Sequence, residues 1–157
     1  IGTNPHYVMF SSAGRKHSQN NAEYSGEFVC SLATYDLREK LNATSAAVSD
    51  SVNEFELAEL TPSPSKFVKP PRVAESPAAL ECEYYRTILL PGNDGTSGDF
   101  AVIIGRVIGV YIDETFIKDG IVDTSALRPI ARLGYMEYAV VSETFELMRP
   151  AVPANST

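Results

Sequence analysis

The chain has 157 residues, of which 44% are hydrophobic and 21% are charged. This length fits one domain, and the apolar fraction is large enough for a core, so general disorder is excluded. Twenty acidic residues against thirteen basic ones give a formal charge of −7, which argues against binding to nucleic acid or to an anionic membrane surface. No apolar stretch approaches the roughly 20 residues that span a bilayer.

The termini and the cysteines bear on organisation and compartment. The chain opens with Ile1, and no basic region followed by an apolar region indicates a secretory signal. Cys30 and Cys82 are far apart in sequence, so we expect buried free thiols and a cytoplasmic location. We predict one domain over residues 1–150 and a flexible tail over residues 151–157.

Short apolar runs and polar segments alternate along the first half of the chain. Strands are predicted over residues 7–11 and 27–33, and helices over residues 18–24, 36–42 and 55–60. Gly26 is expected to end the first helix. Asp36, with Glu39 three positions later, is expected to cap the second helix.

The second half begins with a proline-rich stretch, residues 61–77, which predicts an ordered loop or an extended arm within the same domain. Residues 79–90 and 100–112 are the longest β-rich segments, and the glycine-rich sequence between them predicts an antiparallel hairpin. Residues 100–110 are too apolar for a strand with one solvent-exposed face, so this strand is expected at the centre of a barrel. Gly105 and Gly109 would permit the bends that closure of the barrel requires. A last strand is predicted over residues 139–147. These patterns predict a mainly β fold, a small barrel with a few short helices.

A candidate phosphate site lies between the first strand and the first helix. The sequence SSAGRKHS, residues 11–18, places hydroxyls, a glycine and the adjacent cations Arg15 and Lys16 at a helix start. The N-terminus of a helix attracts phosphate because its first N–H groups are unpaired and its dipole is positive there. The alternative is a solvated turn, because the stretch has neither Walker nor dinucleotide-binding spacing.

A second cluster, RPIARLGYMEY over residues 128–138, combines two arginines with two tyrosines. It is suited to a planar anionic ligand, because tyrosine rings can stack on a ring system while Arg132 approaches an oxygen. The alternative is a loop whose tyrosines pack on the end of the barrel.

No residues stand out as catalytic or metal-binding. The two histidines, His6 and His17, lack ligand spacing, so we expect no metal site. No nucleophile elbow is visible in the sequence, and the catalytic residues are left unassigned.

The order of several motifs resembles the flavin reductase-like family of FMN-binding split barrels. The motifs that carry the resemblance are VMFSSAGRKHS (8–18), GEFV (26–29), NATS (42–45), FELA (55–58), KPPRV (69–73), ESP (75–77), LEC (80–82), GRV (105–107) and RPIARLGYMEY (128–138). They cover nearly the whole chain.

The resemblance implies a six-stranded antiparallel split barrel with Greek-key topology, usually homodimeric, that binds FMN or sometimes FAD. The first strands of the family would precede Ile1, so the N-terminal strands are expected to be missing. The cofactor-binding residues that it implies are Ser11, Ser12, Arg15, Lys16, His17, Ser18, Asn42, Thr44, Arg132 and Tyr138. His17 and Ser18 replace the more usual Asp and Thr, which implies rearranged or weaker phosphate contacts.

Three functions are compatible with this resemblance. The first is an NAD(P)H-dependent flavin reductase that passes hydride from NADH or NADPH to the flavin and supplies reduced flavin to a partner such as a monooxygenase. The second is a non-catalytic FMN-binding electron-transfer protein. The third is a barrel without flavin that acts as an interaction module. The first is preferred, because of the ordered set of motifs with its basic phosphate turn. Flavin chemistry needs no protein acid or base, which agrees with the lack of an obvious catalytic pair in the sequence.

Overall fold

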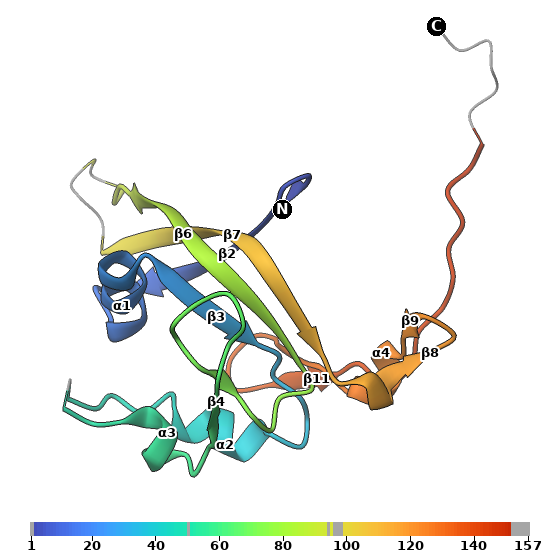
Figure 1. The fold of residues 1–157 in the computed structure, drawn as a ribbon. Helices are drawn as coiled ribbons and strands as arrows, with labels where there is room; N and C mark the ends of the chain where they lie inside the picture. The colour runs from blue at the N-terminus through green and yellow to red at the C-terminus, as the bar shows by residue number, and fades with distance from the viewer. Residues whose placement is uncertain (1, 50, 94, 96–98, 152–157) are drawn as a thin grey trace, which may run out of the picture.

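The computed structural model describes residues 2–49, 51–93, 95 and 99–151. A five-stranded antiparallel sheet in the order β1-β2-β7-β6-β3 forms its centre (Figure 1). Its strands are β1 (Gly2–Thr3), β2 (His6–Ala13), β3 (Glu27–Ser31), β6 (Ala78–Leu90) and β7 (Phe100–Ile112). The mainly β class predicted from the sequence is therefore confirmed.

Three two-stranded sheets and short helices surround this sheet. The small sheets pair β4 (Pro62–Ser63) with β5 (Arg72–Val73), β8 (Ile117–Lys118) with β9 (Ile121–Val122), and β10 (Ile130–Arg132) with β11 (Tyr138–Val140). The helices are α1 (His17–Ser25), α2 (Arg38–Ala43), α3 (Glu54–Leu57), the 3-10 turn η1 (Glu114–Phe116) and α4 (Thr124–Leu127). Within the described residues the main sheet has five strands, and β1 and β3 form its two edges.

The predicted hairpin is confirmed, because β6 and β7 pair along nearly their whole length. β7 lies at the centre of the sheet, as its apolar sequence predicts. The register between the two strands shifts next to Gly105 and Gly109. Both glycines also make room for a ring: a Cβ on Gly105 would lie 2.3 Å from the Phe28 ring, and one on Gly109 would lie 2.5 Å from Phe67.

One face of the sheet carries the core. Ile103 and Ala101 of β7 are buried against Ala22 of α1, and the rings of Phe10 and Phe28 pack edge to face beside them at 5.4 Å. The opposite face is apolar and uncovered. Its exposed side chains, placed on one face by the strand register, are Met9, Ile88, Leu90 and Phe100.

Carboxylates hold the proline-rich loop in place. Buried Glu81 of β6 accepts hydrogen bonds from the backbone N–H groups of Lys66 and Phe67, at 3.0 and 2.6 Å. Glu27 accepts one from the N–H of Lys69, and Glu75 accepts one from the N–H of Thr61. A segment with little regular structure needs such partners for its backbone, so residues 61–77 form an ordered loop, as predicted.

Three sequence predictions need correction. α2 begins after Leu37, not after Asp36, and no side chain caps it, because Asp36 instead pairs with Arg128. α3 is shorter than predicted and ends at Leu57. The last strand ends at Val140, because residues 142–151 have no neighbouring strand with which to pair.

The end of α1 and the free state of the cysteines agree with the sequence. α1 ends at Gly26, which adopts a left-handed conformation with φ 72°. The two cysteines are free; Cys82 is buried and Cys30 is half-buried. The predicted tail lies outside the described residues except for Ala151.

Candidate functional site

The helix start predicted to bind phosphate forms as expected. β2 leads into a turn at Gly14, whose φ is 74°, and α1 begins at His17. Lys16 precedes the helix in an extended conformation, makes no capping hydrogen bond through its side chain, and no acidic residue lies in the first turn. No acidic side chain of the first turn therefore compensates the positive end of the α1 dipole.

This helix start opens into a cavity of about 470 Å³, called here the turn cavity. Its lining residues are Arg15, Lys16, His17, Ser18, Thr44, Ser45, Ala46, Ala47, Val48 and Glu54. Cations, the Ser18 hydroxyl and a helix N-terminus facing one cavity fit a phosphate group. The Thr44 and Ser45 hydroxyls of the lining donate to the carbonyl oxygens of Leu41 and Asn42. Glu54 is the single acidic residue of this lining.

An ion pair positions Arg15 at the mouth of the turn cavity. Its guanidinium lies 2.6 Å from one carboxylate oxygen of Glu23. The other oxygen of this carboxylate accepts hydrogen bonds from Gln19 and Thr87 at 3.0 and 2.7 Å. These bonds, from Gln19 first, then Thr87, and also from Arg15, hold the pKa of Glu23 below its ordinary value of 4.5. Glu23 thus links α1 to β6 while it orients Arg15.

Replacing Glu23 with Gln should change how stability depends on pH. A carboxylate whose pKa is lower in the folded protein stabilises the fold above its unfolded pKa, and this stabilisation is lost as pH falls through the folded value. We expect the free energy of unfolding of Glu23→Gln to fall less steeply than that of the wild type between about pH 5 and pH 3. Urea denaturation at a series of pH values measures this. The control Glu143→Gln changes an exposed side chain and should follow the wild type; equal slopes for all three proteins would contradict the role of Glu23.

The two serines before the turn do not line this cavity. Ser12 is buried, and its hydroxyl donates to the carbonyl oxygen of Gly14 at 2.6 Å. Ser11 is exposed on the other face of β2. Ser12 therefore shapes the turn through its hydroxyl, and contact of either serine with a phosphate stays a prediction.

A second cavity, of about 480 Å³, lies between α2 and the β10–β11 hairpin and is called here the hairpin cavity. Arg132 and Tyr138, predicted to contact the flavin, both line it, as does Asn42. Arg132 donates to the Tyr138 hydroxyl at 3.2 Å and to the Tyr135 carbonyl oxygen at 3.0 Å. The predicted residues thus form two groups. Thr44 joins the phosphate turn and Asn42 joins the hairpin, so the C-terminal end of α2 connects the two cavities.

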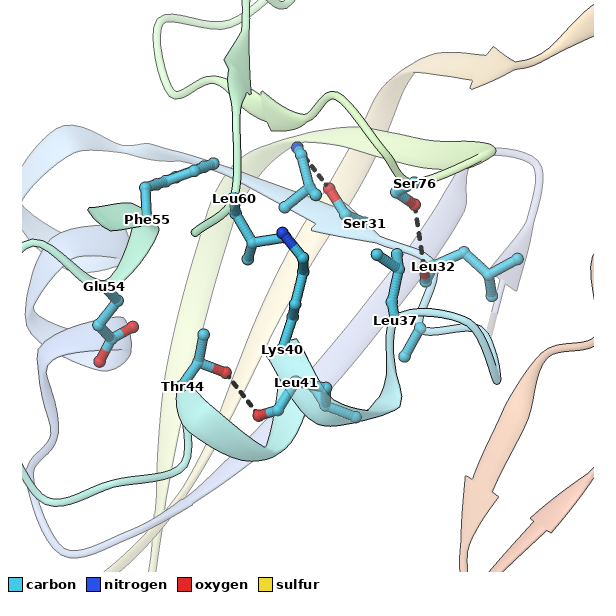
Figure 2. Close-up of a pocket in the computed structure, with 12 residues that line it drawn as sticks. Ser31, Leu32, Leu37, Lys40, Leu41, Thr44, Glu54, Phe55, Leu60 and Ser76 are labelled. Carbon is cyan, nitrogen blue, oxygen red and sulfur yellow. Dashed lines mark hydrogen bonds between the residues drawn. The ribbon is translucent and has the colours of Figure 1, made fainter. Parts of the chain in front are cut away.

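A third, apolar cavity of about 220 Å³ lies behind α2 (Figure 2). Leu37, Leu41, Phe55 and Leu60 contribute to its lining. Several of its polar groups are already bonded within the protein: Ser76 donates to the Leu32 carbonyl oxygen, Thr44 to that of Leu41, and Lys40 to that of Glu59. This cavity therefore suits apolar groups. Sequence reasoning missed it, because its walls come from β3, α2, α3 and β5.

Sequence reasoning also missed Tyr35 and Arg38 of the hairpin cavity. An aromatic residue and an arginine three positions apart were the available signal, but such pairs are common on surfaces. Among the described residues, no group of three or more His, Cys, Asp and Glu side chains could hold a metal ion. None of the helices described is both long and apolar enough to cross a membrane.

The sequence profile of the flavin reductase like domain matches residues 1–131. The protein therefore belongs to the flavin reductase-like family. The crystal structure of nitrilotriacetate monooxygenase component B from Bacillus cereus is similar, with a TM-score of 0.85 and 33% identity over 94% of this chain and 74% of that one. A putative flavin reductase with a split barrel domain from Shewanella frigidimarina shares the fold, with a TM-score of 0.83 and 22% identity over 96% and 74% of the two chains.

Two curated relatives match most of this chain. An uncharacterized protein of Halalkalibacterium halodurans is 37% identical over 89% of this chain and 66% of its own length. The uncharacterized protein YwrF of Bacillus subtilis is 32% identical over 87% of this chain and 67% of its own length. The chain thus spans about two thirds of the length of these relatives.

Proposed function

We propose that this protein binds FMN, or FAD in its place, with the flavin phosphate in the turn cavity. The observation that carries the proposal is a helix start without a side-chain cap or first-turn acid, beside Arg15 and Lys16, in a chain of the flavin reductase-like family. Charge-assisted hydrogen bonds from these cations, with donors from the helix start, suit a phosphate dianion.

The other predicted residues receive roles consistent with their positions. Ser18, Thr44 and His17 line the turn cavity and are proposed to complete the phosphate site, with Ser11 and Ser12 on the strand that leads to it. Asn42, Arg132 and Tyr138 line the hairpin cavity and are proposed to lie beside the rest of the flavin. Arg132 is suited to hydrogen bonding with a carbonyl oxygen, and the Tyr138 ring to an edge or face contact.

We propose that the protein is an NAD(P)H-dependent flavin reductase. A bound flavin supplies the chemistry, since it accepts hydride from a nicotinamide nucleotide. The protein's residues then bind and orient the cofactor: cations hold the phosphate, and the walls of the two cavities fix the rest of the molecule. This role requires no acid or base from the protein.

The partners follow from the same proposal. Component B of a monooxygenase is 33% identical to this chain, so a partner oxygenase that consumes reduced flavin is proposed. A homodimer is proposed as well. The exposed apolar face of the sheet that contains Met9, Leu90 and Phe100 supports it, because apolar patches of this kind mark interaction surfaces.

An anaerobic absorbance titration tests the reductase proposal. Full-length protein loaded with FMN is mixed first with NADH and then with NADPH, and the oxidised flavin band is followed. We expect the band to bleach much faster than that of free FMN. Flavin that binds but stays oxidised would favour the electron-transfer alternative, and absence of flavin binding would contradict both.

A further inference from the structure

Three arginines lie in or next to the wall of the hairpin cavity, although the net charge of the protein is −7. Arg38 and Arg132 line the cavity, and Arg128 lies against its wall. The guanidinium groups of Arg38 and Arg128 lie 4.1 and 4.5 Å from the centre of the Tyr35 ring. Two of the three cations therefore share one aromatic residue of the cavity.

The fold holds these arginines together from distant parts of the chain. Tyr35 donates its backbone N–H to the Arg128 carbonyl oxygen at 3.0 Å, and Thr34 and Pro129 form a β-bridge beside it. Arg38 donates a side-chain hydrogen bond to the Tyr35 carbonyl oxygen at 2.9 Å. Backbone contacts thus place Arg128 beside Tyr35, and a side-chain hydrogen bond holds Arg38 there.

The carboxylates near these arginines neutralise their positive charge only weakly. Glu39 lies 3.5 Å from Arg38 and Asp36 lies 3.3 Å from Arg128, but these carboxylate side chains are 80% and 78% exposed. Exposed pairs of this kind contribute between about 0 and 1 kcal/mol, so an anion with better geometry can displace them. Arg132 donates its side-chain hydrogen bonds to the Tyr138 hydroxyl and the Tyr135 carbonyl oxygen, which are uncharged groups.

The cavity combines this charge with aromatic surface. Tyr35 and Tyr138 are part of a lining that also contains Ile130, Met136 and Val140. A ligand that fits such a site carries both a flat ring and a phosphate, because guanidinium groups bind phosphate in a bidentate manner and also stack on rings. A nucleotide with a phosphomonoester has both features.

We propose that Arg38 and Arg128 bind the 2′-phosphate of NADPH, so that the protein prefers NADPH to NADH, while Arg132 keeps its place beside the flavin. This inference rests on the proposed function, because it assigns the hydride donor of the same flavin site. The flavin phosphate and the nucleotide phosphate would then occupy different cavities, at the α1 start and at the hairpin, connected by the end of α2. An arginine near the ribose is a known means of accommodating a 2′-phosphate.

Binding of nucleotide fragments tests the assignment without requiring turnover. Calorimetry on the FMN-loaded protein should give a much lower Kd for adenosine 2′,5′-bisphosphate than for adenosine 5′-monophosphate. The double variant Arg38→Ala, Arg128→Ala should raise the Kd of the bisphosphate about ten- to a hundredfold and leave that of the monophosphate nearly unchanged. The KM for NADPH should rise similarly, while the KM for NADH stays near the wild-type value.

A matched control is Arg106→Ala, which removes a similarly exposed arginine from a surface pair with Glu83 and should leave both Kd values unchanged. Equal affinity of the wild type for the two fragments would overturn the inference. So would a double variant that loses FMN while it retains the bisphosphate, since the cluster would then serve the flavin phosphate. Wild-type protein that fails to bind FMN would instead contradict the proposed function.

Discussion

Replacing Arg15 and Lys16 together with Ala should weaken FMN binding on the order of a hundredfold, while riboflavin binding changes little. Charge-assisted hydrogen bonds are worth about 1.5–3 kcal/mol each. A hundredfold change corresponds to about 2.7 kcal/mol. This is slightly less than the roughly 3–6 kcal/mol expected of two such bonds, because Arg15 already pairs with Glu23 and its side chain is 64% exposed. Riboflavin lacks the phosphate, so it does not use these two cations. Fluorescence quenching of each flavin on titration with protein measures both Kd values.

The comparison of the two flavins separates phosphate binding from general damage to the site. Equal weakening of FMN and riboflavin would mean that the phosphate lies elsewhere or that the turn has lost its conformation. The control Lys69→Ala changes an exposed lysine of the proline-rich loop outside the lining of the turn cavity. Its Kd for FMN should stay within about twofold of the wild-type value.

Replacing Gly105 with Ala should destabilise the fold by about 2 kcal/mol, as expected for overpacking in a filled core. A Cβ at this position would lie 2.3 and 2.5 Å from two carbon atoms of the Phe28 ring and 3.2 Å from the Glu83 carbonyl oxygen. Phe28 packs against Phe10 beside buried Ile103, so its ring has little room to move. Urea denaturation monitored by circular dichroism measures the change, with the slope of the transition checking that unfolding stays two-state.

Two further variants identify the cause of that loss. In Gly109→Ala the new Cβ would meet the Phe67 ring at 2.5 Å, but Phe67 is 54% exposed and can move aside, so a cost under about 1 kcal/mol is expected. Adding Phe28→Leu to Gly105→Ala should cost less than the sum of the two single changes, because the smaller side chain relieves the clash. Strict additivity would show that the ring is not the obstacle.

The sequence alone predicted the local elements well, because their signals are short-range. The alternation in β2 and β3, the left-handed end of α1 at Gly26, and the hairpin of β6 and β7 each depend on neighbouring residues. The helix start with Arg15 and Lys16 was predicted for the same reason. The predicted strand over residues 139–147 was too long, since an extended sequence becomes a strand only where a partner strand is available.

The tertiary structure decided which of the predicted residues meet. Thr44 lines the turn cavity and Asn42 lines the hairpin cavity, because α2 lies between the two cavities. The spacing of these residues in the sequence does not indicate that they belong to different cavities. Arg128 reaches Asp36 across 92 positions, and also Tyr35 next to it, through the backbone pairing of two loops. Such contacts depend on long-range register and not on local pattern.

The sequence by itself determined a mainly β domain, its central hairpin and a cationic helix start suited to phosphate, because periodicity, turn residues and capping act within a few positions. Only the tertiary structure decided how Glu81 holds the proline-rich loop, why Gly105 is needed beside Phe28, and how Arg38 and Arg128 meet at the Tyr35 ring beside one cavity. The physical reason is that buried partners and shared cavities arise when segments distant in sequence pack together.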